Sequence, residues 1–249
     1  MPGLTVTIIT RDEVDRLGEA VASAAFADEI VIVDSGSTDG TIELARRLTP
    51  RVVTRDWPGF AAQKNFAAAE ASHDWILSLD ADERVSPALG TEIRAILSAG
   101  PQAPAYRVPR VSFYLGRWIR STDWYPDYQV RLYDRRAASW AGEYVHESVQ
   151  TAGAVGRLRG ELLHFPYRDV SHHLRTIDRY TALAARQMRD QGRTVSAAGL
   201  AARAAGAFLR NYLLRGGFRQ GGVGLIVSVL NSYYVFLKFA RLWTATRER

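Results

Sequence analysis

Short apolar runs alternate with amphipathic stretches through the first third of the chain. The pattern predicts four strands, at residues 4–9, 29–33, 51–54 and 75–79. It predicts three helices between them, at residues 12–25, 41–48 and 60–71. This alternation favours a mostly parallel central sheet with helices on both faces, whose ligand crevice lies beyond the carboxyl ends of the strands. The predicted fold class is therefore α/β.

The pattern changes after about residue 100. Residues 101–165 are rich in aromatic side chains and arginine, and strand-like runs at 106–114 and 128–133 predict added strands and loops that cover the crevice. From about residue 169 the pattern is helical, with Ser171 as the expected N-cap of the first of three helices and Gly192 as its stop. We therefore expect an α/β domain over residues 1–168 and a C-terminal helical region over residues 169–249.

Charge is distributed unevenly between these two regions. Residues 1–165 contain 18 Lys and Arg against 22 Asp and Glu, whereas residues 166–249 contain 14 against 4, so an acidic body precedes a basic tail. The chain has no cysteine, which excludes a disulfide scaffold, thiolate zinc sites and cysteine nucleophiles. The first apolar run is too short for a signal peptide, so the expected location is the cytoplasm.

Acidic side chains follow two of the predicted strands. Asp80 and Asp82 come directly after the run at 75–79, and two carboxylates so close together favour a divalent cation, Mg²⁺ or Mn²⁺, shared with phosphate oxygens. Asp34 ends the run at 29–33, where an acid of a nucleotide-binding α/β fold binds ribose or base. The alternatives are solvated loop acids and a simple turn. The glycine-rich motifs of dinucleotide dehydrogenases and P-loop NTPases are absent from the sequence.

Several motifs together resemble one enzyme family. ITRDE, IVIVDSGSTDGT, GFAAQKNFA and WILSLDADE, in this order, are similar to the inverting family 2 glycosyltransferases with the GT-A fold. Downstream, YPDYQVRLYDR, VHESV, LLHFPY and RNYLLRGGFRQGGVGL resemble the subgroup that builds lipopolysaccharide core, the glucosyltransferases that act on a heptose. The resemblance implies a nucleotide-sugar donor, UDP-glucose by preference, and a glycan or lipid-linked acceptor.

The resemblance also assigns donor-side roles. It implies that Asp34 binds the nucleoside, that Thr10 and Asp12 flank the base, that Asp82 ligates the metal directly, and that Asp80 lies nearer the ribose or a metal-bound water. Lys64 contacts base or diphosphate, or else faces solvent from its helix. His146 completes the metal shell or binds phosphate, or else is structural; His164 has the same alternatives. Glu83 extends the acidic motif in a supporting or capping role.

On the acceptor side, Glu147 is the expected catalytic base, with Asp127 second and Glu143 third, because a buried carboxylate can accept the proton of an attacking hydroxyl. Arg131 shares one strand face with Gln129 and is expected to bind the diphosphate, with a surface charge as the alternative.

The basic tail carries Arg203, Arg210, Arg215 and Arg219 beside apolar residues, and residues 223–240 fall just short of a comfortable transmembrane span. This pattern of arginines beside apolar residues predicts one of two arrangements. Either a helix lies in an anionic membrane interface, on the inner face of the cytoplasmic membrane, or a helical pair has its basic face in water. A non-catalytic envelope scaffold and a nucleic-acid-binding module are the other classes considered. The acidic crevice disfavours nucleic acid as a partner.

Overall fold

The computed structural model describes residues 2–142 and 147–246, which form two compact units. Unit 1 comprises Met1–Arg110 and Asp127–His164, and unit 2 comprises Val111–Pro126 and Phe165–Arg249. This division differs from the expected one at residue 168 because the short excursion before Asp127 joins the C-terminal helices. We describe each unit by itself.

Four parallel strands form the first half of the sheet in unit 1, in the order β3 (Arg51–Thr54), β2 (Glu29–Asp34), β1 (Leu4–Thr10) and β4 (Trp75–Asp80). All four were predicted. The inner strands β1 and β4 are buried on both faces, and β1 alternates apolar residues with buried threonines.

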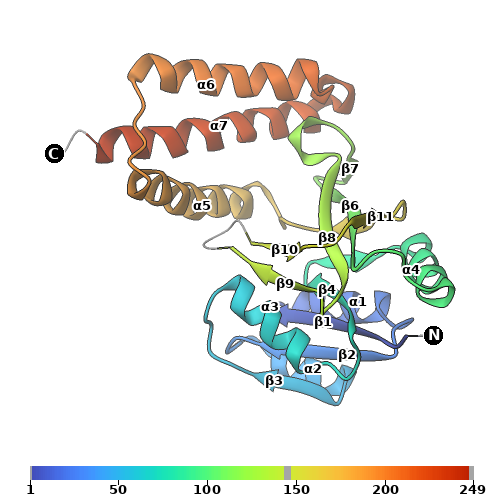
Figure 1. Cartoon of the computed structure of the whole chain (residues 1–249). Coiled ribbons are helices and arrows are strands. Elements are labelled where there is room, and N and C mark those ends of the chain that lie inside the picture. The colour runs from blue at the N-terminus through green and yellow to red at the C-terminus, as the bar shows by residue number, and fades with distance from the viewer. Residues whose placement is uncertain (1, 143–146, 247–249) are drawn as a thin grey trace. The chain divides into compact units, whose positions relative to one another are not determined.

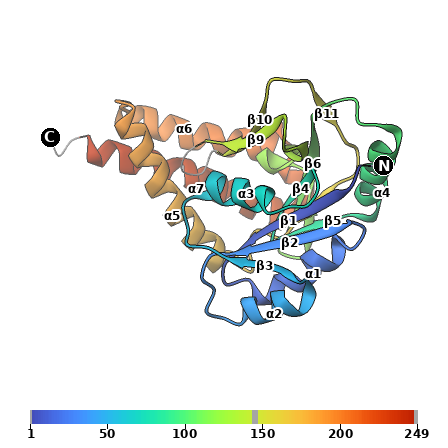
Figure 2. The same ribbon diagram turned by 60° about the horizontal axis from the view of Figure 1, so that its bottom comes forward.

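Helices cover both faces of these strands (Figures 1 and 2). Leu4, Val6 and Ile8 alternate toward the face that carries α1 (Val14–Ser23), α2 (Thr41–Leu48) and α4 (Pro87–Ala99). Ile9, Val31 and Val33 pack on the opposite face against Ala67 of α3 (Phe60–Ala69). The period of two along each strand thus divides the core into two layers. The sequence pattern missed α4, although Ser86 caps it and Pro87 occupies its first turn.

The second half of the sheet is mixed. β8 (Asp127–Asp134) pairs antiparallel with both β4 and β6 (Ala105–Tyr114), and β12 (Leu162–His164) and β5 (Glu83–Val85) follow. β7 (Arg117–Ile119) and β11 (Val155–Arg157) pair with β6 at two places. β9 (Ala138–Ala141) and β10 (Ser148–Thr151) form a separate antiparallel pair. Only β6 and β8 had been predicted here.

Unit 2 contains α5 (Val170–Asp190), α6 (Ala197–Leu209) and α7 (Gly221–Ala245), as the three predicted helices. Asp169 caps α5 by accepting from the His172 amide, so the prediction of Ser171 as the cap was wrong by two residues. Gly192, at φ 69°, follows the helix end as expected. Short turns of 3₁₀ helix (η1, Thr122–Trp124; η3, Gly217–Gln220) and π-helix (η2, Arg210–Leu214) complete the unit.

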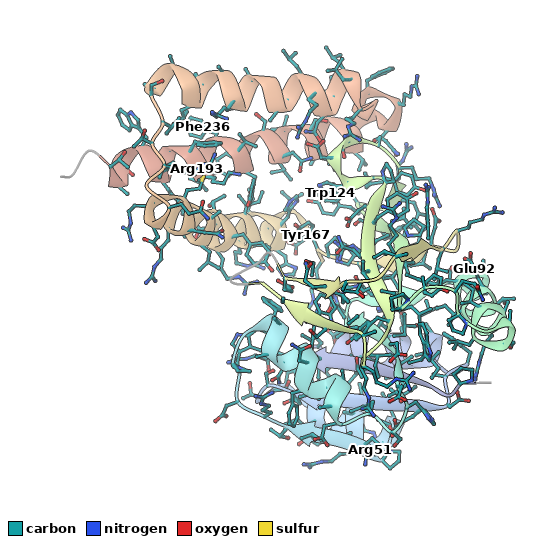
Figure 3. The ribbon with its side chains drawn as sticks, viewed as in Figure 1. Arg51, Glu92, Trp124, Tyr167, Arg193 and Phe236 are labelled. Carbon is teal, nitrogen blue, oxygen red and sulfur yellow. The ribbon has the colours of Figure 1, made fainter. Side chains whose placement is uncertain are left out.

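An aromatic cluster anchors the start of α5 within unit 2. Trp124 and Tyr167 lie close together (Figure 3), and the Tyr167 ring stacks on His173 with centroids 3.8 Å apart. His173 Nδ1 lies 3.1 Å from the Tyr114 hydroxyl. Burial lowers the pKa of His173 to about 4 and raises that of Tyr114 to about 12, so both are neutral near pH 7. The cluster is therefore an uncharged packing centre.

Candidate active site

Three polar side chains meet at the carboxyl edge of the parallel strands. Thr10 of β1 pairs in register with Asp34 of β2, and Ile9 pairs with Asp80 of β4. Because neighbouring parallel strands end at the same edge, the predicted nucleoside-binding and metal-binding motifs lie side by side. Two buried polar atoms, the Thr10 hydroxyl oxygen and Arg131 Nε of β8, have no hydrogen-bond partner among the described residues. A bound polar ligand would satisfy such groups.

Asp34 organises the turn that follows β2. Its Oδ1 accepts from the amides of Gly36 (2.9 Å) and Ser37 (2.8 Å), and its Oδ2 accepts from the Ser37 hydroxyl. Gly36 adopts φ 81°, which favours glycine. The Asp34 side chain is fully buried, so in this structure it shapes the turn, and its role toward a nucleoside stays a prediction.

The loops after β1 and β2 are joined through Asp12. Its Oδ1 accepts from the Thr38 amide at 2.8 Å, and its own amide donates to the Ser37 hydroxyl at 2.8 Å. Asp12 adopts φ 54°, a left-handed conformation that aspartate tolerates better than most residues. The contact with the Asp34 turn makes the two loops one continuous rim at the end of the sheet.

Six charged side chains of alternating sign form an ion-pair chain across the site. In order of contact they are Lys64, Asp80, Arg131, Glu83, Arg110 and Asp127. Lys64 Nζ lies 2.9 Å from Asp80 Oδ1, and Arg131 Nη2 donates to Asp80 Oδ2 and to Glu83 Oε1, each at 2.7 Å. Lys64 and Arg131 are each only 3% exposed, so the alternatives of a solvent-facing lysine and a surface arginine are wrong.

The far end of the ion-pair chain lies on β6 and β8. Arg110 donates to Glu83 at 3.0 Å and, through Nε, to Asp127 at 2.8 Å. Arg110 and Asp127 are cross-strand partners in register. Gln129 donates to the other Asp127 oxygen at 2.7 Å. Asp127 and Gln129 therefore lie together on β8. The pairing of β8 with β6 shifts by one residue between Leu132 and Val130, so the period of two that predicted a common face for Gln129 and Arg131 is interrupted at Arg131. Both oxygens of Asp127 already accept hydrogen bonds.

The positive charges of the ion-pair chain hold Asp80 ionised. Burial alone would raise the pKa of Asp80, but the positive charges of Arg131 and Lys64 outweigh burial and hold it well below its ordinary value. Both oxygens of its carboxylate are engaged by Lys64 and Arg131.

A pH dependence of stability follows from the lowered pKa of Asp80. A carboxylate whose pKa is depressed on folding stabilises the protein above its unfolded pKa, about 3.9, and this contribution is lost as the pH falls. We expect urea midpoints of the wild type to fall between about pH 5 and about pH 3, and Asp80→Asn to flatten this slope. Asp190→Asn, at an exposed site in unit 2, is the control. An unchanged slope for Asp80→Asn would contradict the prediction.

Asp82 lies beside a histidine. β12 pairs with β5 so that His164 is opposite Glu83, and this register brings His164 Nε2 to 3.5 Å from Asp82 Oδ2. Arg16 of α1 is 3.9 Å from the same oxygen. Burial would raise the pKa of Asp82, but the imidazole of His164 and Arg110 outweigh it and lower that pKa. His146, the other predicted ligand, lies outside the described residues.

A carboxylate and an imidazole are a donor pair that divalent cations accept. The described part of the chain gathers no group of three or more His, Asp or Glu side chains that could hold a metal by themselves. The arrangement thus fits a cation whose remaining ligands come from a bound phosphate and water, as is usual for Mg²⁺ at phosphate sites.

Glu147 is placed by the β9–β10 pair. Val149 of β10 is opposite Trp140 of β9, and Glu147 lies two residues before Val149, just outside the strand. The Trp140 ring lies 4.2 Å from Lys64 Nζ, which connects this hairpin to the ion-pair chain. Glu147 Oε2 is buried and has no hydrogen-bond partner among the described residues, unlike the Asp127 oxygens. Glu143, the third candidate, lies outside the described residues.

Sequence reasoning missed several residues of the site. Arg110 was not singled out, although a lone arginine in the apolar strand VPRVSFY was a usable signal. Trp140 was missed as well, and its contact with Lys64 depends on a hairpin that the pattern did not predict. Glu83 had only a supporting role in view, yet its carboxylate is fully buried and joins two arginines.

The sequence is similar to those of known glycosyltransferases. The model of the family described as glycosyl transferase family 2 matches residues 5–155. The chain is 32% identical to the lipopolysaccharide core biosynthesis glycosyltransferase LpsC of Rhizobium meliloti (strain 1021), over 96% of this chain and 92% of the relative. It is 29% identical to an uncharacterized glycosyltransferase of Rickettsia prowazekii (strain Madrid E), over 97% of this chain and 87% of that protein.

One solved structure shares the fold over nearly the whole chain. It is the mannosyltransferase PcManGT from Pyrobaculum calidifontis in complex with GDP-Man and Mn²⁺. The TM-score is 0.57 at 16% identity, covering 97% of this chain and 87% of that chain. At this identity the likeness concerns the fold alone, and it agrees with the GT-A fold expected from the sequence.

Proposed function

This chain belongs to glycosyl transferase family 2, and we propose that it is a metal-dependent, inverting hexosyltransferase that uses a nucleotide-sugar in cell-envelope glycan synthesis. The observation that carries the proposal is the acidic motif at the end of β4, where Asp82 lies beside His164 and Asp80 is held between Lys64 and Arg131. A cation-binding acid beside two buried positive charges suits the diphosphate of a nucleotide-sugar.

Asp82 and His164 would hold the cation, Mg²⁺ or Mn²⁺, together with diphosphate oxygens. When bound, the metal neutralises negative charge on the nucleoside diphosphate. Asp80 is assigned to positioning rather than to direct ligation, in line with its expected place nearer the ribose. PcManGT is described with Mn²⁺ and GDP-Man, which supports a cation in this fold but does not identify the donor here.

Arg131 and Lys64 would stabilise the departing diphosphate. Arg131 Nε has no partner among the described residues, so this buried donor is available to donate to a phosphate oxygen. Preorganised positive charge is most effective where negative charge develops in the transition state. Thr10, Asp12 and Asp34 are proposed to form the nucleoside end of the same site, because their loops make the rim beyond β1 and β2.

Glu147 is the proposed catalytic base. Its buried, unpartnered oxygen can accept the proton of the attacking hydroxyl, whereas Asp127 is already bonded to Arg110 and Gln129. The acceptor oxygen forms a bond to the anomeric carbon as the bond to the diphosphate oxygen breaks, and the proton goes to Glu147. A single displacement inverts the anomeric configuration.

Donor and acceptor are proposed from the relatives. UDP-glucose is the donor suggested by the resemblance of the motifs, and a saccharide of lipopolysaccharide type, free or lipid-linked, is the acceptor suggested by the similarity to LpsC. We place the enzyme in the cytoplasm, at the inner face of the cytoplasmic membrane, where lipid-linked acceptors of this kind lie.

The proposal is tested by screening nucleotide-sugars for binding and slow hydrolysis with Mn²⁺, with Mg²⁺ and with EDTA. We expect one donor, UDP-glucose, to be hydrolysed only with metal, and Asp82→Asn to lower the rate by about 10²-fold or more. Glu43→Gln, an exposed acid of α2 outside the ion-pair chain, is the control. If no donor is bound or hydrolysed with either metal, a non-catalytic scaffold becomes the better interpretation.

A further inference from the structure

Exposed apolar side chains are concentrated in one part of unit 2. Nine large apolar residues that are exposed lie between residues 209 and 236; they are Leu209, Leu213, Leu214, Phe218, Leu225, Ile226, Val229, Tyr233 and Phe236. Leu214 is 83% exposed, which is extreme for a leucine in a folded protein. Scattered apolar residues are normal on a surface, but a contiguous group marks an interaction site.

Part of this group forms a strip along α7. Leu225, Val229, Tyr233 and Phe236 recur at intervals of four, four and three, which places them on one face of the helix; Figure 3 labels Phe236. We call these four residues the apolar strip.

The opposite side of α7 is packed within unit 2. Val227, Leu230 and Leu242 are buried there. The helix lies between α5 and α6 (Figure 1), and hydrogen bonds fix it to both neighbours. The Ser232 hydroxyl donates to Ala204 O of α6, and Arg241 is ion-paired with Asp178 of α5. Only one side of the helix is therefore uncovered within its unit.

This one-sided burial bears on how α7 meets a bilayer. Gly217–Ala245 is the one helix in the described part of the chain that is long and apolar enough to cross a membrane. Its most apolar stretch of 18 residues has a mean hydropathy of 1.6, and 28% of that stretch is buried. A spanning helix would have to carry its polar attachments to α5 and α6 into hydrocarbon, which is costly. An orientation along the membrane surface keeps these attachments out of the hydrocarbon.

The turn between α6 and α7 adds charge to the apolar group. Residues 210–220, which we call the tip, expose Leu213, Leu214 and Phe218. Four arginines surround them; they are Arg117, whose Nη1 donates to Gln220 O, and Arg210, Arg215 and Arg219 within the tip itself. Asp123 is the carboxylate that pairs with both Arg210 and Arg215. The sequence has no Asp or Glu from residue 191 to residue 247, so the surface is positive.

We propose that the tip and the apolar strip together form a surface that lies in the interface of an anionic phospholipid bilayer. Leucine and phenylalanine side chains enter the acyl boundary, and the surrounding arginines meet lipid phosphates. Charge decides against a second copy of the chain as the occupant, because two tips of the same positive sign would repel each other. The proposal makes the expected membrane partner residue-specific, and it does not depend on the identity of donor or acceptor.

The test is sedimentation of the full chain with vesicles of phosphatidylcholine alone or mixed with phosphatidylglycerol. We expect the wild type to pellet with the anionic vesicles at low salt, and the double variant Leu214→Ser, Phe218→Ser to bind about tenfold more weakly or less. Arg219→Gln is expected to weaken binding and its salt dependence. Leu174→Ser and Leu48→Ser, at 40% and 37% exposure outside the surface, are matched controls that retain binding. Circular dichroism and melting midpoints check that every variant folds.

Four outcomes would overturn the proposal. Three concern vesicles: the wild type fails to pellet with anionic vesicles at low salt, the tip double variant binds them as well as the wild type does, or the wild type binds neutral vesicles equally well. The fourth is that alkaline carbonate does not extract the protein from cell membranes, which would mean a spanning helix. A dimer in sedimentation velocity that the tip double variant dissociates, without vesicle binding, would assign the surface to a second copy. None of these measurements uses a sugar, so their failure is distinguishable from failure of the proposed transferase activity.

Discussion

Replacement of Glu147 by glutamine is expected to slow glycosyl transfer by about 10²-fold to 10⁴-fold, the usual contribution of a general base. Glutamine keeps the size and the hydrogen-bonding oxygen of the side chain but cannot accept a proton at neutral pH. Donor binding is expected to stay unchanged, because Lys64 and Arg131, the residues proposed to stabilise the diphosphate, lie on α3 and β8. The measurements are kcat for transfer and the dissociation constant of the donor.

Asp127→Asn is the comparison that decides between the two base candidates. It removes charge from the end of the ion-pair chain, where both carboxylate oxygens already have donors. We expect it to lower kcat far less than Glu147→Gln does. If Asp127→Asn abolished transfer while Glu147→Gln left most of it, Asp127 would be the base and the assignment of Glu147 would be wrong.

Replacement of Arg131 by methionine is expected to destabilise unit 1 by about 3–5 kcal/mol, the usual cost of removing one partner from a buried ion pair. The change leaves Asp80 and the fully buried Glu83 with unbalanced negative charge. Urea unfolding followed by the circular dichroism of the sheet would measure the loss. Because the chain has two units, the transition of unit 1 must be resolved from that of unit 2.

Arg136→Met is the matched control for this prediction. Arg136 follows β8 and pairs with Asp134 and Asp74, but its side chain is 66% exposed. Water screens exposed pairs, so little change in the urea midpoint is expected. Equal losses for Arg131→Met and Arg136→Met would show that the ion-pair chain has no special role in stability. The paired variant Arg131→Met, Glu83→Leu should recover part of the loss, because it removes an unpaired buried charge.

The site itself was only partly predictable from the sequence. Asp34, Asp80 and Asp82 could be found because an acid directly after an apolar run marks a strand end, and parallel strands end at one edge. The period of two predicted one face for Arg131 and Gln129, but it could not predict the one-residue shift of β8 against β6 at Arg131. Arg110 and Glu83 could not be paired, since their contact depends on which strands neighbour each other, and strand order is not encoded locally. Trp140 depended likewise on the β9–β10 pairing.

The sequence by itself determined the α/β alternation, the acids at the strand ends, the helical and basic C-terminal region and the family resemblance. These features depend on local periodicity and composition, which neighbouring residues carry together. Only the tertiary structure decided that Lys64 and Arg131 are buried, that Asp80 is shared between them, that His164 stands beside Asp82, and that one face of α7 is left uncovered. Each of these follows from which distant segments pack together, and burial and pairing across the chain are properties of that packing alone.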